Sequence, residues 1–131
     1  MTIIQPEGWP QPKGYANGVA AQGRVIAVAG QVGWDPLTER IVPGDLATQV
    51  AQALRNVVAV LGAAGAKPEH VVRLTWFVTD RVAYATSREP IGRAYREVFG
   101  SHFPAMTLVV VAGLLEVGAK VEIEATAVVP A

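Results

Sequence analysis

Two glutamates near the C-terminus are the acidic side chains whose spacing could support chemistry. Glu122 and Glu124 alternate with apolar residues in a segment with strand character, so both side chains point to one face, about 7 Å apart. A carboxylate in such a position can hold and activate a water molecule; the alternative is a pair of solvated glutamates on a strand edge. Glu122 is the candidate for chemistry, and Glu124 is expected to be structural.

The two histidines are weaker candidates. Imidazole titrates near neutral pH, so His102 could act as a general base. It lies in a Ser-His-Phe-Pro turn, however, where packing or capping is the expected role, and His70 begins a strand. Neither has the carboxylate spacing of a metal site. With no cysteine in the chain, a disulfide, a thiol nucleophile and a thiolate metal site are excluded, and no cofactor is implied.

Most of the arginines fall within one segment of the chain. They are Arg73, Arg81, Arg88, Arg93 and Arg96. A nucleic-acid site would need them on one face beside exposed aromatic residues, whereas Glu89 and Glu97 interrupt them and Glu89 can pair with Arg93 one helical turn away. A solvated helix face is therefore expected, with the alternative that one arginine anchors a ligand carboxylate.

The composition points to a small protein that associates with copies of itself. Of 131 residues 51% are hydrophobic and 17% are charged, and the mean hydropathy is +0.32. So little charged surface suggests that another copy covers part of the apolar surface. The net charge of zero argues against nucleic-acid and membrane partners. No secretory signal and no run of about 18 apolar residues is present, so a cytoplasmic protein is expected.

Periodicity predicts a single α+β domain over residues 1–131. After an irregular arm, the expected order is two strands, a helix, a strand, a helix and two strands. The expected ranges are 1–15 for the arm, 17–28 for the first strands, then 45–64, 71–79, 90–99, 106–112 and 121–128. Asp45 can cap the first helix, Gly65 suits the left-handed position after it, Pro90 favours the first turn of the second helix, and Gly100 ends it. Trp34-Asp35-Pro36 marks a loop.

The predicted elements leave one face of the sheet uncovered. A strand-helix-strand crossover of this length usually joins parallel neighbours, and two helices can cover one face only. Residues 108–111 are nevertheless all apolar, so their strand is expected to be buried on both faces. The uncovered face is therefore expected to pack against another subunit.

Six segments are similar, in chain order, to landmarks of the RidA/YjgF family, whose members also carry the label endoribonuclease L-PSP. They are Gly14-Tyr15 with Asn17-Gly18, Val28-Ala29-Gly30-Gln31, Leu74-Thr75-Trp76-Phe77-Val78-Thr79-Asp80, Tyr95 to Phe99, Phe103-Pro104-Ala105 and Val121-Glu122-Ile123-Glu124-Ala125. Each motif alone is weak, but together they cover nearly the whole chain in the right order. The sequence therefore resembles that family.

The resemblance implies a fold, an assembly and a chemistry. The fold would be a mixed, chorismate-mutase-like sheet with two helices on one face, and the assembly a homotrimer with small-molecule clefts between subunits. In active members an arginine directly after Phe-Pro-Ala clamps the carboxylate of a 2-imino or 2-enamino acid, water attacks the imine carbon, and ammonia leaves. By the same resemblance Glu122 and Tyr15 are the catalytic candidates. The substrate-binding candidates are Gly30, Gln31, Trp34, Tyr95, Met106 and Leu108.

Met106 stands where the family's arginine is expected, and Leu108 replaces a small polar residue or cysteine. A thioether offers no positive charge to a carboxylate. Two hypotheses follow: an atypical enamine or imine deaminase, or a related hydrolase, acting on a pathway intermediate; or a non-catalytic binding protein for a small apolar or aromatic metabolite. RNA cleavage is suggested by the family label alone.

The aromatic residues near the expected cleft leave two interpretations open. Trp9, Trp34 and Tyr15 could seal the boundary between subunits, or they could form the wall of a pocket for a flat ligand. With Met106 and Leu108, the second interpretation predicts that neutral aromatic compounds bind more tightly than small 2-keto acids.

Overall fold

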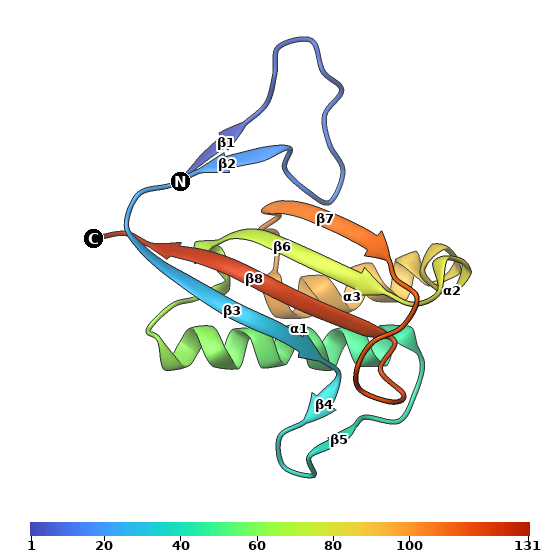
Figure 1. Cartoon of the computed structure of the whole chain (residues 1–131). Helices are drawn as coiled ribbons and strands as arrows, with labels where there is room; N and C mark the ends of the chain where they lie inside the picture. Colours follow the sequence, from blue (N-terminus) through green and yellow to red (C-terminus); the bar gives the residue numbers. More distant parts are fainter.

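A four-stranded mixed sheet forms the centre of the molecule. The computed structural model describes all residues from Met1 to Ala131. Its strands lie in the order β3 (Arg24–Val32), β8 (Val121–Val129), β6 (Val71–Val78) and β7 (Ala105–Val110). β8 is antiparallel to both of its neighbours, whereas β6 and β7 are parallel. Figure 1 shows the helices on one side of this sheet. The predicted α+β class is confirmed.

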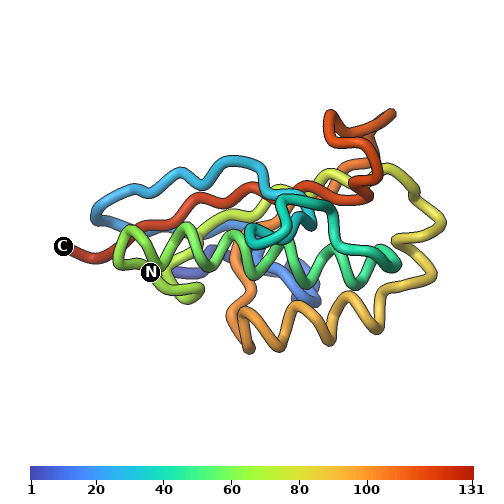
Figure 2. The backbone as a smooth tube through the Cα atoms, turned by 90° about the horizontal axis from the view of Figure 1, so that it is seen from below, coloured from blue at the N-terminus to red at the C-terminus, as the bar shows by residue number.

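Two helices cover that side. They are α1 (Leu46–Ala63) and α3 (Arg88–Phe99), which lie side by side when the molecule is seen from below (Figure 2). Asp45 caps α1 by accepting a hydrogen bond from the Thr48 amide at 3.0 Å, and Gly65 follows with φ 75°. Pro90 stands in the first turn of α3 and Gly100 ends that helix, so both helix predictions are confirmed. No helix combines the length and apolar character that crossing a membrane requires.

The core lies between the sheet and the helices. Val50, Leu54, Val57 and Leu61 of α1 are completely buried. They pack on the inward residues of the strands and on α3, forming one cluster of 19 buried residues. Two buried polar residues of α1 fix the ends of strands: the Asn56 amide donates to the carbonyls of Val32 and Trp34 at 3.1 and 2.8 Å, and the Gln49 side chain bonds to the backbone of Gly118 and Lys120.

Several short elements were not predicted. The arm contains β1 (Thr2–Ile4), which pairs with β2 (Gly18–Ala20), the first of the two strands expected in residues 17–28. The loop at Trp34 contains β4 (Trp34–Asp35), which pairs with β5 (Arg40–Ile41). The other two are the 3-10 turn η1 (Pro68–His70) and the helix α2 (Arg81–Thr86), which Asp80 caps by accepting from the Ala83 amide at 2.9 Å. Elements of two to six residues are too short for a periodic pattern to show.

The expectation that each strand-helix-strand crossover joins parallel neighbours is correct for one pair of strands and wrong for the other. β6 and β7 are parallel neighbours joined through α2 and α3. β3 and β6, joined through α1, are separated by β8, which enters between them from the end of the chain. In β6 a register irregularity between Val71 and Arg73 interrupts the alternation of side chains, so Val71 and Leu74 are both fully buried although they are three residues apart.

Residues 108–111 are not buried on both faces within the single chain, and their burial against another subunit stays a prediction. β7 is an edge strand, and Val109 and Val110 are 38% and 50% exposed. Near its start, the Ala16 amide donates to the Pro104 carbonyl at 2.9 Å, which brings the arm against this edge.

Candidate active site

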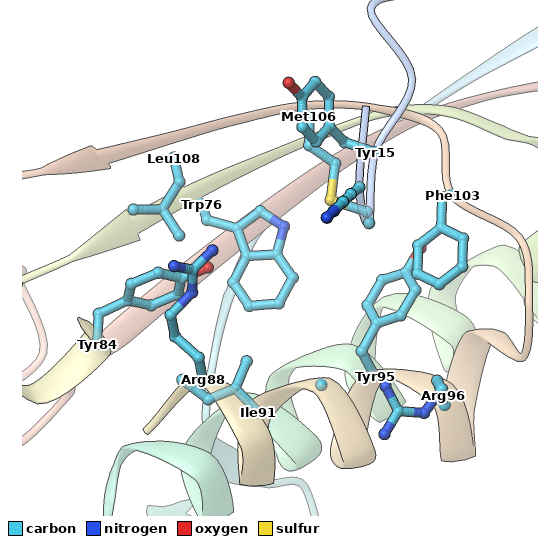
Figure 3. A pocket seen from close by; sticks show the side chains of 13 residues that line it. Tyr15, Trp76, Tyr84, Arg88, Ile91, Tyr95, Arg96, Phe103, Met106 and Leu108 are labelled. Carbon is cyan, nitrogen blue, oxygen red and sulfur yellow. The ribbon is translucent and has the colours of Figure 1, made fainter. Parts of the chain in front are cut away.

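A cleft opens between the β6–β7 edge of the sheet and the helices α2 and α3. Its volume is about 490 Å³, and the arm closes one side of it. It is lined by Lys13, Gly14, Tyr15, Trp76, Tyr84, Arg88, Ile91, Gly92, Tyr95, Arg96, Phe103, Met106 and Leu108. Figure 3 shows the labelled members of this set arranged around an open space.

One wall of the cleft is a group of packed aromatic rings. Tyr95 stacks on Phe103 and Phe99 with ring centroids 5.2 and 5.1 Å apart, and Trp76 lies tilted against it at 6.4 Å. The Tyr95 hydroxyl donates to the His102 carbonyl, and burial raises the pKa of this phenol far above its usual range. Tyr95 therefore provides a rigid surface, and its hydroxyl stays protonated at neutral pH.

His102 has a packing role, as expected from its turn. Its Nε2 atom lies 2.7 Å from the Val71 carbonyl, which ties the turn before β7 to the start of β6. His70 accepts from the Lys67 amide through Nδ1 at 3.0 Å. No group of three or more His, Cys, Asp or Glu residues is placed to hold a metal ion.

The two residues that follow Phe-Pro-Ala at alternate positions point into the cleft. In the register of β6 and β7, Met106 lies opposite Leu74 and Leu108 opposite Trp76, and all four face the helices. Tyr15 lies at the end of the cleft near Met106, and its hydroxyl is turned away from Trp76 (Figure 3). The structure thus brings Tyr15, Tyr95, Met106 and Leu108 together.

Glu122 lies on the opposite, open face of the sheet. It pairs with Phe77 of β6 and Val32 of β3, and its side chain alternates with the buried Val121 and Ile123. Gly30 makes room for it, because a Cβ at Gly30 would lie 2.6 Å from Oε2 of Glu122. No hydrogen bond or ion pair within the chain engages this carboxylate, so it is free to bind a water molecule.

The other predicted residues lie apart from the cleft. Gln31 follows Gly30 in β3, and its side chain donates to the Ala29 carbonyl at 3.1 Å. Trp34 is half-buried in β4, outside the cleft, where its carbonyl accepts from Asn56. Trp9 is exposed in the arm. In a single chain the predicted site is therefore divided: one group lines the cleft, while Gly30, Gln31 and Glu122 lie around the open face.

The sequence did not identify several cleft residues. Arg88 and Arg96 are exposed, as a solvated helix face requires, but both also line the cleft, which the sequence leaves open only as an alternative for one unspecified arginine. The expected Glu89–Arg93 pair does form, at 3.5 Å on the outer side of α3. Trp76 is known from the sequence only as part of a strand motif; it pairs with Leu108 of the edge strand β7 and lines the cleft.

The comparison with protein families identifies the chain. The family model described as endoribonuclease L-PSP matches residues 10–129. The chain belongs to the RidA/YjgF family. The resemblance seen in the six sequence motifs is therefore confirmed.

Individual relatives agree with this assignment. A bovine 2-iminobutanoate/2-iminopropanoate deaminase is 39% identical over 126 residues, which are 96% of this chain and 88% of the relative. Among solved structures, a Rid-family protein of unknown function from Yersinia pestis is 32% identical, with a TM-score of 0.85 and 98% of each chain covered. TdcF from E. coli, solved with bound serine, is also 32% identical, with a TM-score of 0.69 and 98% of each chain covered. The mixed sheet and its helical layer are thus those of the RidA/YjgF family.

Proposed function

We propose that this RidA-family chain is an imine or enamine deaminase, and that its clefts are completed between copies of a homotrimer. The reaction adds water to the C=N bond and releases a carbonyl compound and ammonia. The names of the relatives support it, since several are 2-iminobutanoate/2-iminopropanoate deaminases. The presence of Glu122, Tyr15 and Gly30 at the positions of the family motifs supports it as well.

The observation that carries this proposal is the division of the candidate residues between two faces of one sheet. The cleft opens on the helix side of β6 and β7, and Glu122 lies on the open side of β8. Side chains on opposite faces of one sheet cannot act on the same substrate atom. In a symmetric trimer, however, the open face of one copy can close the cleft of its neighbour. The exposed Val109 and Val110 at that edge would then be covered.

In that arrangement each group has a defined task. The aromatic wall and Leu108 exclude water from the substrate body, while Glu122 of the adjoining copy orients the attacking water and accepts its proton. The nitrogen must then be protonated before it leaves as ammonia, and Glu122 can donate to it the proton that it accepted from the water. Because Gly30 has no side chain, the carboxylate can lie directly over the strand.

The substrate is expected to differ from the small imines named for the relatives. Met106 supplies no cation, and the cleft wall contains Trp76, Tyr84, Tyr95 and Phe103. Burial of a ring against such a wall is favourable by about 25 cal/mol per Å². We therefore propose an imine with a large flat side chain rather than the imino acids of three or four carbons that are named for the relatives.

Imine hydrolysis can be measured directly. An amino-acid oxidase acting on phenylalanine or 2-aminobutanoate generates each imine, and semicarbazide traps what remains. We expect this protein to reduce trapping of the phenylalanine imine more strongly than that of the smaller imine. Glu122→Gln should lose the effect, and Glu124→Gln is the matched control that should retain it. Unchanged trapping of both imines with the wild-type protein would reject the enzymatic proposal.

The proposed homotrimer is tested by measuring the mass of the assembly in solution. Light scattering coupled to size exclusion should give three times the chain mass of 13.8 kDa. A monodisperse monomer at micromolar concentration would reject the intersubunit cleft.

A second candidate is a non-catalytic binding protein for an aromatic metabolite. The rigid aromatic wall, in which the Tyr95 hydroxyl donates to the His102 carbonyl, favours it. Saturable binding of aromatic compounds without turnover of either imine would select this candidate.

A further inference from the structure

The lining of the cleft is cationic. Lys13, Arg88 and Arg96 contribute to it, and no aspartate or glutamate does. None of the three cations forms an ion pair with a carboxylate of the chain, since the salt bridge of α3 joins Arg93 to Glu89. A cleft with apolar walls and unneutralised cations attracts a ligand that carries negative charge.

Trp76 supplies a hydrogen-bond donor that the chain leaves unused. The residue is 4% exposed, and its indole Nε1 is a buried polar atom with no hydrogen-bond partner. Such a donor lowers stability when it stays unpaired, and buried donors in native proteins are nearly always paired. In Figure 3 this nitrogen is on the side of the ring turned toward Met106. Met106 is half-buried, unbranched and flexible, so it can move aside for a ligand oxygen.

The two arginines of the cleft are placed differently. In Figure 3 the guanidinium of Arg88 is drawn next to Tyr84, on the side turned toward Trp76 and inside the ring of labelled side chains, whereas that of Arg96 lies along α3 below Tyr95. The position of Gly92 agrees with this, because a Cβ there would be 3.2 Å from Nη1 of Arg96. Arg88 is therefore the cation that faces the same space as the unpaired indole.

We propose that the cleft binds the carboxylate of an aromatic or large apolar acid, with Arg88 as its cation and the Trp76 indole as a hydrogen-bond donor to it. Arg88 thus supplies, from α3, the positive charge that Met106 does not supply from β7. A guanidinium can bind both oxygens of a carboxylate, which fixes the orientation of the ligand as well as its charge. The inference rests on the proposed function in naming the substrate class of the same cleft. It replaces the expectation of a preference for neutral ligands, because that expectation placed no cation in the cleft.

Matched probes test the charge preference without any turnover. Phenylacetate and phenylacetamide have nearly the same shape, and only the first is an anion. Calorimetry should show tighter binding of phenylacetate to the wild-type protein. Arg88→Gln should weaken phenylacetate by about tenfold or more and leave phenylacetamide little changed. Arg93→Gln removes the same charge from the outer side of α3 and should bind like the wild type.

The indole can be observed separately. The chain has three tryptophans, and Trp76→Phe assigns the Trp76 indole N–H resonance. Phenylacetate should shift this resonance downfield while those of Trp9 and Trp34 move less. Trp76→Phe should also weaken phenylacetate binding severalfold while leaving the aromatic wall in place.

The inference is overturned by equal affinity for the two probes, by no saturable binding of either at millimolar concentration, or by loss of binding in Arg96→Gln but not in Arg88→Gln. These results differ from failure of the proposed function. Charge-selective binding without imine turnover leaves this site standing and removes the catalytic role. Imine turnover without charge selectivity does the reverse.

Discussion

The two helices that cover the sheet, α1 and α3, are packed in different ways. Against α1 the interior is filled: Val50, Leu54 and Val57 have no exposed surface, and the buried Asn56 uses its side chain in hydrogen bonds to two strand ends. Beside α3 a cleft of about 490 Å³ remains, bordered by an indole N–H without a partner. The packing against α1 is closed, as in the core that holds a fold together. Beside α3 a cavity and an unpaired hydrogen-bond donor remain, which is the pattern of a binding site.

The largest expected difference between the core at α1 and the cleft at α3 is in how much stability is lost when a leucine side chain is shortened to alanine. Leu54→Ala should lower the free energy of unfolding by about 3 kcal/mol or more, because it opens a cavity in a filled core. Leu108→Ala should lower it by about 1 kcal/mol or less, because that side chain already borders open space. Urea denaturation measures both. Equal losses would contradict the contrast in packing.

Removing a paired polar group should cost more than removing an unpaired one. Asn56→Ala leaves the carbonyls of Val32 and Trp34 and the Gln52 amide without partners, and should destabilise the protein by about 2 kcal/mol. Urea denaturation at one fixed pH is the measurement, and a loss below about 0.5 kcal/mol would show that water replaces these bonds.

Trp76→Phe tests the removal of a polar group that has no hydrogen-bond partner. It removes an N–H that has no partner and keeps most of the ring contact with Tyr95. The free energy of unfolding should therefore change by less than about 1 kcal/mol. A much larger loss in the same denaturation experiment would mean that the indole is part of the closed core.

The smallest expected effect is the pH dependence of the helix caps. Hydrogen bonds from Thr48 hold the pKa of the Asp45 carboxyl below 3.8, whereas Ser87, the cap of α3, makes no side-chain cap bond. Because the folded pKa is lowered, the stabilisation by this cap is fully present only above the unfolded pKa, at about pH 5 and higher, and is lost as the pH falls through the folded value. Asp45→Asn should flatten the acid side of a curve of Tm against pH. An unchanged curve would show that other carboxyls control acid unfolding.

The sequence was informative where a pattern repeats along many residues. The α1 helix has five turns of apolar spacing with Asp45 and Gly65 at its ends, and it forms as predicted. The order of the main strands and helices was also readable from such patterns. The separation of β3 from β6 was not, because it depends on pairing with β8, about a hundred residues after β3 begins.

The candidate site was readable in part for a related reason. Met106 and Leu108 follow a motif, and their place in the cleft follows from the alternation of β7. Arg88 and Trp76 come from a helix and a strand that are adjacent only in the folded chain, and an arginine on a charged helix looks solvated from its neighbours. Likewise, the sequence does not show that Glu122 and the cleft lie on opposite faces of the sheet, because this depends on which face the helices cover.

The central claim is that the cleft of one copy works with Glu122 of another, and mixed assemblies test it most directly. Glu122→Gln removes one half of the site, and Met106→Trp fills the other half, so each variant alone should lack imine hydrolysis. Unfolding and refolding an equal mixture should restore activity in about a quarter of the clefts, those that combine two intact halves. A mixture that forms mixed trimers, seen by native mass spectrometry, but stays as inactive as its parents would contradict the claim.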